Sequence, residues 1–95
     1  MDKIKEFNQL IDIERQKQEQ KWGEQNHEPP IWLAILTEEV GELATAILNN
    51  KFGGLRYDRR QDIIDNELVQ IGAVCKAMWE CSKRNNWEVI KNERR

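Results

Sequence analysis

The stretch that decides the fold runs from Trp32 to Ile47 and reads Trp-Leu-Ala-Ile-Leu-Thr-Glu-Glu-Val-Gly-Glu-Leu-Ala-Thr-Ala-Ile. Its apolar residues recur every three or four positions, which is typical of a helix with one buried face. On a helical wheel at about 100° per residue, Glu39 falls inside the apolar arc, Glu42 within it near one edge, and Glu38 just outside. The sequence therefore predicts a helix with carboxylates on its buried face.

A second stretch, Glu67-Leu-Val-Gln-Ile-Gly-Ala-Val74, has the same character. Glu67 falls at the centre of its apolar arc and Gln70 also lies inside it, whereas Asp62 and Asp65 fall on the opposite, solvated side. Burying an unpaired carboxylate costs several kcal/mol. The inward-facing glutamates of the two helices are therefore expected to share a cation.

A divalent metal ion is the cation that these residues favour. Glu39, Glu42, Glu67 and Gln70 offer only oxygen donors, a set that suits Mg²⁺ or Mn²⁺ better than Zn²⁺. Carboxylates on facing helices are an established way to build such a site in a bundle. The alternative is that each glutamate pairs with a lysine or arginine or lies at a helix edge in solvent, and this alternative weighs most for Glu38.

The rest of the chain predicts further helices and no strand, so the expected fold is an all-α helical bundle, a single domain over residues 1–95. The predicted helices run over about 3–21, 30–49 and 59–83, with a short last one from Asn85 or Asn86 through Arg94. Asp2 is expected to cap the first helix. The Glu14–Lys21 end of that helix is entirely polar, which predicts that it extends into solvent or onto a partner.

Composition limits the classes of partner. A chain of 95 residues, of which 39% are hydrophobic and 34% charged, buries a small core of its own, so a homo-oligomer is expected. The net charge of -2, with both signs interspersed, argues against polymeric nucleic acid as a partner.

The cellular compartment is indicated by the lack of a membrane span, a signal peptide and a disulfide framework in the sequence. The longest apolar run is far too short for a bilayer, and the Met1–Glu6 segment passes straight into a helical pattern without a signal-peptide core. Cys75 and Cys81 form neither a CxxC site nor a disulfide framework, and both are expected as reduced core residues. These features predict a cytoplasmic protein with no membrane partner.

The two acidic stretches together resemble the MazG family of all-α nucleoside triphosphate pyrophosphohydrolases, in which ExxE and ExxD motifs lie on two helices. Here ExxE is Glu39 and Glu42, and the second pair maps onto Glu67 and Gln70. The 22–27 segment, Trp-Gly-Glu-Gln-Asn-His, is similar to the short stand-alone members of phages and prophages. The resemblance covers roughly residues 15–82.

The resemblance implies an enzyme that hydrolyses nucleoside triphosphates to the monophosphate and pyrophosphate, as a dimer or tetramer. It implies that Glu39, Glu42 and Glu67 hold Mg²⁺, while Glu38 orients or deprotonates the attacking water. Such chemistry depends mainly on positioning and on neutralising phosphate charge.

Gln70 departs from the aspartate of the family. Glutamine is a neutral and weaker oxygen donor, so the site loses one negative charge. This change leaves open a catalytically weak regulatory protein that binds nucleotide and metal. A third alternative is a purely structural helical oligomer whose glutamates pair with arginines.

Substrate contacts are expected around the acidic helices. A base pocket requires a flat apolar face and edge hydrogen bonds, for which Trp22, Asn26, His27 and Trp32 are candidates, with Asn26 as a reader of the base edge. The alternatives are core packing for Trp22 and Trp32 and a loop hydrogen bond for His27.

Triphosphate also requires cations. Lys51 and Arg59 lie near the connection between the two acidic helices, and Lys76, Lys83 and Arg84 lie further along the second. The alternative for each is an ordinary solvated charge. Of the remaining tryptophans, Trp79 is expected in the core and Trp87 as packing for the last helix.

Overall fold

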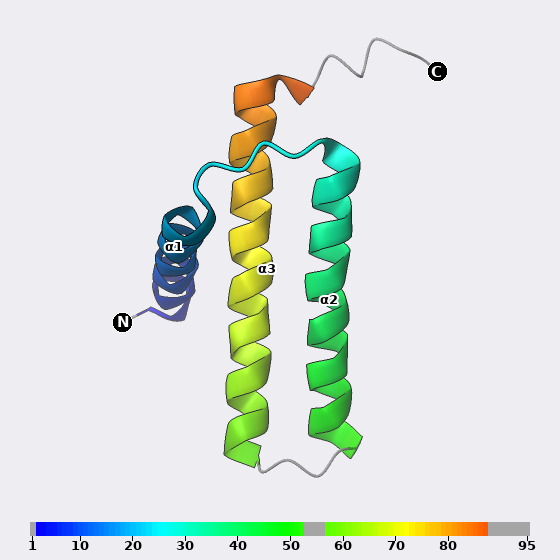
Figure 1. The fold of residues 1–95 in the computed structure, drawn as a ribbon. Helices are drawn as coiled ribbons and strands as arrows, with labels where there is room; N and C mark the ends of the chain where they lie inside the picture. Colours follow the sequence, from blue (N-terminus) through cyan, green and yellow to red (C-terminus); the bar gives the residue numbers. More distant parts are fainter. Residues whose placement is uncertain (1, 53–56, 88–95) are drawn as a thin grey trace.

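The computed structural model describes residues 2–52 and 57–87, with the helical backbone alone at 50–52 and 57–60. Over these residues the chain forms three helices and no strand, which confirms the all-α prediction (Figure 1). The helices are α1 (Lys3–Trp22), α2 (Pro29–Phe52) and α3 (Tyr57–Asn85). Most of the predicted fourth helix lies outside the described residues.

The first helix begins and ends at residues suited to those positions. The Asp2 carboxylate accepts a hydrogen bond from the Ile4 backbone nitrogen at 2.8 Å, which confirms its capping role. Gly23 ends α1 with a φ of 73°, a conformation that glycine adopts without a Cβ clash. Pro29 opens α2, where the missing backbone N–H would have had no helical partner.

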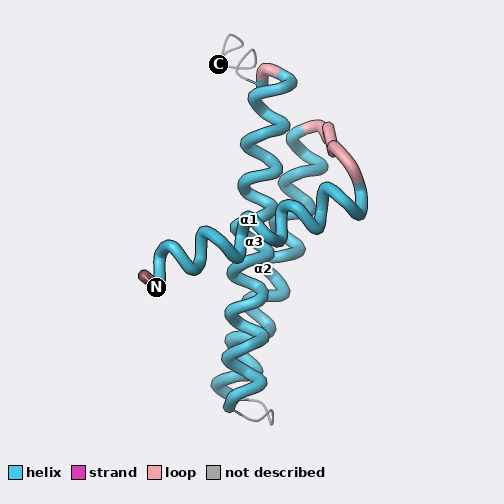
Figure 2. Tube along the Cα trace, turned by 90° about the vertical axis from the view of Figure 1, so that its left-hand side faces the viewer, coloured by secondary structure: helices cyan, strands magenta, loops and turns pink. Residues whose placement is uncertain are grey.

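Helix α3 is the shared support of the fold. It forms an antiparallel hairpin with α2, and α1 packs against another side of it (Figure 1). The view from the side shows α1 crossing α3 at a steep angle, with the 23–28 loop leading to the start of α2 (Figure 2). Elements distant in sequence therefore meet along α3.

The buried core lies in the part of the hairpin nearest the 23–28 loop. Trp32 is only 2% exposed and packs against Val74, Ala77 and Cys81 of α3. Small side chains on α3 leave the room that the indole fills. Trp87, predicted as packing for the last helix, packs at the edge of this cluster.

Two residues predicted for the core are not there. Trp79 is 64% exposed and Cys75 is also exposed, whereas Cys81 is fully buried as predicted. Trp79 and Cys75 lie on a side of α3 that neither α1 nor α2 covers. The helical wheel placed both in an apolar arc that is wider than the surface these helices bury.

A large apolar surface stays uncovered on all three helices. Among the described residues, the exposed apolar side chains include Ile4, Phe7, Leu10, Ile13, Leu33, Val40, Ile47 and Leu68. The radius of gyration is 15.9 Å, against about 12 Å for a compact chain of this length. The described parts of the three helices therefore leave many of their apolar side chains uncovered by one another. None of the three helices, over the described part of the chain, has the length and apolar character that a membrane span requires.

The polar end of α1 docks on α3, which corrects the expectation that it extends into solvent or onto a partner. Arg15 forms ion pairs with Glu80 of α3 and with Glu19, and Gln18 is buried. Lys76 of α3 pairs with Asp12. Ile11 is the single buried apolar residue of α1, so these charged contacts accompany only a small apolar contact.

Gly72 sets how closely α1 approaches α3. A Cβ at Gly72 would lie 2.6 Å from Cδ1 and 2.9 Å from Cγ1 of Ile11, closer than carbon atoms tolerate. At Gly41 of α2, by contrast, a Cβ would meet nothing within 4 Å. The close crossing therefore depends on the absence of a side chain at Gly72.

We predict that Gly72→Ala lowers the free energy of unfolding by about 1 kcal/mol, because steric strain of about 1–3 kcal/mol outweighs a gain in helix propensity of about 1 kcal/mol. Gly41→Ala, the matched control, should raise it by up to about 1 kcal/mol. Urea unfolding at a fixed protein concentration measures both. In an Ile11→Val background the loss from Gly72→Ala should shrink, and strict additivity of the two changes would contradict the close contact.

Candidate metal centre

Helix α2 brings three carboxylates together within about one turn. Glu38, Glu39 and Glu42 each offer an oxygen that lies within 4.8 Å of an oxygen of the other two. The spacings of three and four residues place Glu42 beside both of the others on the helix surface. The cluster thus includes Glu38, which the sequence placed just outside the buried face.

Helix α3 adds a fourth carboxylate from the opposite side. The Glu67 carboxyl lies close enough to those of Glu42 and Glu39 to share a proton with them. Its Oε2 atom is buried and has no hydrogen-bond partner. Glu39 and Glu67 are half-buried, while Glu38 and Glu42 are exposed. The exposure of Glu42 differs from the expectation of a buried position, because Glu42 lies at the edge of the apolar arc.

Burial and mutual repulsion both disfavour the charged form of these carboxylates. Desolvation, followed by the charges of Glu42, Glu67, Glu38 and Glu14, raises the pKa of Glu39 above its ordinary value. Desolvation, followed by the charge of Glu42, likewise raises the pKa of Glu67. No lysine or arginine whose side chain the structure describes forms an ion pair with any of these four glutamates. Negative charge therefore accumulates here without compensation from those residues.

The donor atoms fit a hard divalent cation. Four carboxylates from two helices converge, one buried oxygen is unpartnered, and the cluster holds no nitrogen or sulfur donor. Mg²⁺ and Mn²⁺ favour such oxygen ligands. Gln70 is half-buried and lines the same pocket as Glu38 and Glu39, so its amide oxygen is available at this side of the cluster.

A pocket of about 230 Å³ opens beside the carboxylates, between all three helices. Trp22 of α1 and Trp32 of α2 contribute flat apolar surface to its wall. Trp22 is 55% exposed, whereas Trp32 also belongs to the core. The pocket thus joins an aromatic region to an acidic one.

A wider groove of about 600 Å³ lies between α1 and α3, but its chemistry is different. Its charged side chains pair with one another, as in Arg15 with Glu80 and Lys76 with Asp12. No unpaired cluster of one sign remains there among the described residues. We therefore place the candidate site at the smaller pocket.

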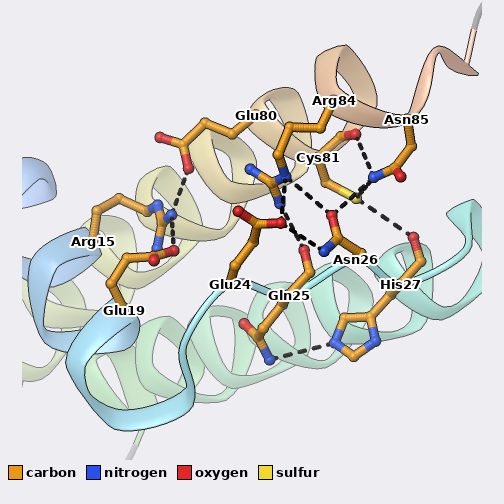
Figure 3. A network of polar contacts seen from close by, with 10 residues as sticks. All are labelled: Arg15, Glu19, Glu24, Gln25, Asn26, His27, Glu80, Cys81, Arg84 and Asn85. Carbon is orange, nitrogen blue, oxygen red and sulfur yellow. Dashed lines mark hydrogen bonds and ion pairs between the residues drawn. The ribbon is translucent and has the colours of Figure 1, made fainter.

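In the loop before α2, two of the predicted site residues are engaged in contacts outside the pocket, and Figure 3 shows the hydrogen bonds of Asn26. The Asn26 Oδ1 accepts hydrogen bonds from Arg84 Nε at 3.0 Å and from Asn85 Nδ2 at 2.9 Å. The Asn26 amide nitrogen donates to Glu24. The His27 ring packs edge-on against Trp32, with ring centroids 5.0 Å apart. Neither Asn26 nor His27 lines the pocket.

The described cations of α3 are engaged elsewhere. Arg84 donates to Gln25 O at 2.9 Å and pairs with Glu24, so it fixes the loop (Figure 3). Lys83 lies over the Trp79 ring at 5.5 Å from its centroid. The side chains of the other predicted phosphate ligands, Lys51 and Arg59, lie outside the described residues.

Three residues of this region were missed by sequence reasoning. Gln18 and Gln25 line the pocket, and Glu14 contributes to the negative potential at Glu39. Glu14, Gln18 and Trp22 follow one another at four-residue spacing, which marks a single face of α1. That spacing could have predicted a shared face of α1. The face was missed because it lacks the apolar periodicity by which buried helix faces are recognised.

Comparisons of the chain with protein-family models, with curated proteins and with solved structures found no match. The donor atoms of the cluster and the pocket beside it are therefore the basis on which a function is inferred.

The raised pKa values predict the pH dependence of stability in the metal-free protein. A carboxyl whose pKa is higher in the folded state stabilises the fold fully below its unfolded value, and that contribution is lost as the pH rises through the folded value. The contributions of Glu39 and Glu67 should therefore decline as the pH rises from the ordinary value of 4.5 towards neutral.

Urea unfolding in EDTA across this pH range isolates the effect when variants are compared. Glu67→Gln should be more stable than the wild type at pH 7, and the difference should shrink as the pH falls. Asp65→Asn, an exposed change on the same helix, should follow the wild type. If the free energy of unfolding of Glu67→Gln varied with pH in parallel with that of the wild type, the raised pKa of Glu67 would be contradicted.

Proposed function

We propose that the protein is a Mg²⁺-dependent nucleoside triphosphate pyrophosphatase, which hydrolyses ribo- or deoxyribonucleoside triphosphates to the monophosphate and pyrophosphate. The observation that carries this proposal is the convergence of four carboxylates beside a pocket lined by two tryptophans. The family resemblance of the two acidic stretches points in the same direction.

Each carboxylate has a role suited to its position. Glu39, Glu42 and Glu67 would hold the ion between α2 and α3, with Gln70 as an adjacent neutral oxygen donor. When bound, Mg²⁺ supplies neutralisation of phosphate charge and activation of water. Glu38 lies exposed on the cluster and lines the pocket, where its carboxylate orients the attacking water or accepts its proton.

The length of the pocket along α2 suits a nucleotide. Trp32 and Glu39 are two turns apart, a rise of about 10 Å, and both line the pocket. A base against the tryptophans leaves the sugar between them and the phosphates at the carboxylates. Lys51 and Arg59 are the proposed phosphate contacts, and His27 supports Trp32 from behind the pocket.

A homo-oligomer, dimer or tetramer, is part of the proposal, as is a cytoplasmic location. The exposed apolar side chains of α1, α2 and α3 support the homo-oligomer, because a second copy would remove them from water. The acidic cluster opens on the surface at Glu38 and Glu42, so subunits could share sites. Neither a membrane nor polymeric nucleic acid belongs to this proposal.

A second candidate is a regulatory protein that binds nucleotide and metal with little turnover. Gln70 favours it, since a neutral side chain stands beside the carboxylates where an acidic one would strengthen ion binding. The purely structural alternative requires arginines opposite the glutamates. The described arginines, Arg15 and Arg84, pair with other acids instead.

Pyrophosphate release from a panel of nucleoside triphosphates tests the proposal. Turnover should require Mg²⁺ or Mn²⁺, and Glu39→Gln should lower it more than about 100-fold, because even outer-shell changes at metal sites cost about 10- to 100-fold. Asp65→Asn should retain wild-type turnover. Metal-dependent nucleotide binding without turnover, with activity gained in Gln70→Asp, would instead favour the regulatory protein.

A further inference from the structure

Gln18 is the one buried polar side chain among the described residues, at 7% exposure, and it lines the pocket. Its Oε1 accepts a hydrogen bond from Arg15 Nη1 at 3.3 Å. The oxygen end of the amide is thereby fixed, and the NH₂ end forms no hydrogen bond with another described residue. The NH₂ group stays accessible in the pocket, where it is free to donate to a ligand. The pocket therefore offers a hydrogen-bond donor at Gln18.

Gln25 offers the complementary group. Its Nε2 lies 3.4 Å from Nε2 of His27. An amide nitrogen only donates, so in this orientation the imidazole nitrogen is the acceptor of the contact. The Oε1 of Gln25 is left as an acceptor, and Gln25 lines the same pocket as Gln18.

Both glutamines are positioned by arginines that are anchored on α3, and Figure 3 shows these two arginines with Gln25. Arg15, which holds Gln18, is itself paired with Glu80. Arg84 donates to the backbone oxygen of Gln25 at 2.9 Å and so fixes the loop that presents this side chain. The donor and the acceptor are thus held by groups outside the pocket, which is how a binding site is preorganised.

We propose that Gln18 and Gln25 determine base specificity, by donating to and accepting from the edge of a nucleobase seated against Trp22 and Trp32. This inference rests on the proposed function and deepens it. The ligand needs a planar ring that carries an acceptor and a donor along one edge, as nucleobases do. A sugar phosphate without a base lacks both the flat face and that edge. The two glutamines thus take the base-reading role predicted for Asn26, whose side-chain amide is hydrogen-bonded to Glu24, Arg84 and Asn85.

Calorimetric titration with the common nucleosides, in EDTA, tests the proposal. Nucleosides carry no phosphate, so the measurement is independent of the acidic cluster and of turnover. The wild type should bind at least one nucleoside, and Gln18→Met and Gln25→Met should each weaken it about tenfold, the effect of one lost hydrogen bond in a buried site. Gln9→Met, an exposed glutamine on the same helix, should bind as the wild type does.

Gln18→Glu provides a second variant that is expected to fold, because a carboxylate preserves the contact with Arg15. It replaces the NH₂ with an oxygen and should also weaken binding about tenfold or more. Circular dichroism verifies the helical content of every variant.

Binding unchanged in Gln18→Met, Gln25→Met and Gln18→Glu, or no nucleoside binding by the wild type, would overturn the proposal. Pyrophosphate release with an unaltered base preference in these variants would also overturn it while leaving the proposed function intact. Nucleoside binding that depends on both glutamines, in a protein without turnover, would support it and count against the proposed function alone.

Discussion

The burial of carboxylates within a cluster of four glutamates is the constraint that the α2–α3 pairing must accommodate. Glu39 and Glu67 face one another across the hairpin, and their pKa values are raised by desolvation first and by the neighbouring charges second. The apolar core around Trp32 lies towards one part of the hairpin and supplies no opposite charge to offset this cost. A divalent ion bound between α2 and α3 would neutralise the carboxylates directly. Folding and ion binding would then be thermodynamically linked.

Small residues on α3 allow α1 and α2 to pack closely against it, and this places the pocket beside the carboxylate cluster. Gly72 lets Ile11 approach closely, and Ala77 lets Trp32 fill the core on another side of the helix. Since α1 is thereby held near α3, Gln18 and Trp22 reach the pocket that α2 lines with Trp32 and Glu39. One narrow helix thus positions the aromatic, amide and acidic parts of the site.

The predictable features were those set by local periodicity. The three main helices, the Asp2 cap and the half-buried positions of Glu39 and Glu67 follow from patterns within one helix each. The errors at Trp79 and Cys75 have a common cause, because a helical wheel does not say how much of an apolar arc its neighbours cover. Gln18 and Gln25 were missed since their positions depend on contacts such as Arg15–Glu80 and Arg84–Asn26, which join residues far apart in the chain.

The central claim is that the acidic cluster is a divalent metal centre, and titration with Mn²⁺ followed by electron paramagnetic resonance tests it most directly. The account predicts saturable Mn²⁺ binding to the wild type that Mg²⁺ displaces. It also predicts that binding is lost in Glu67→Gln and retained in Asp65→Asn. A wild type that binds no Mn²⁺, or a Glu67→Gln variant with full affinity, would contradict it.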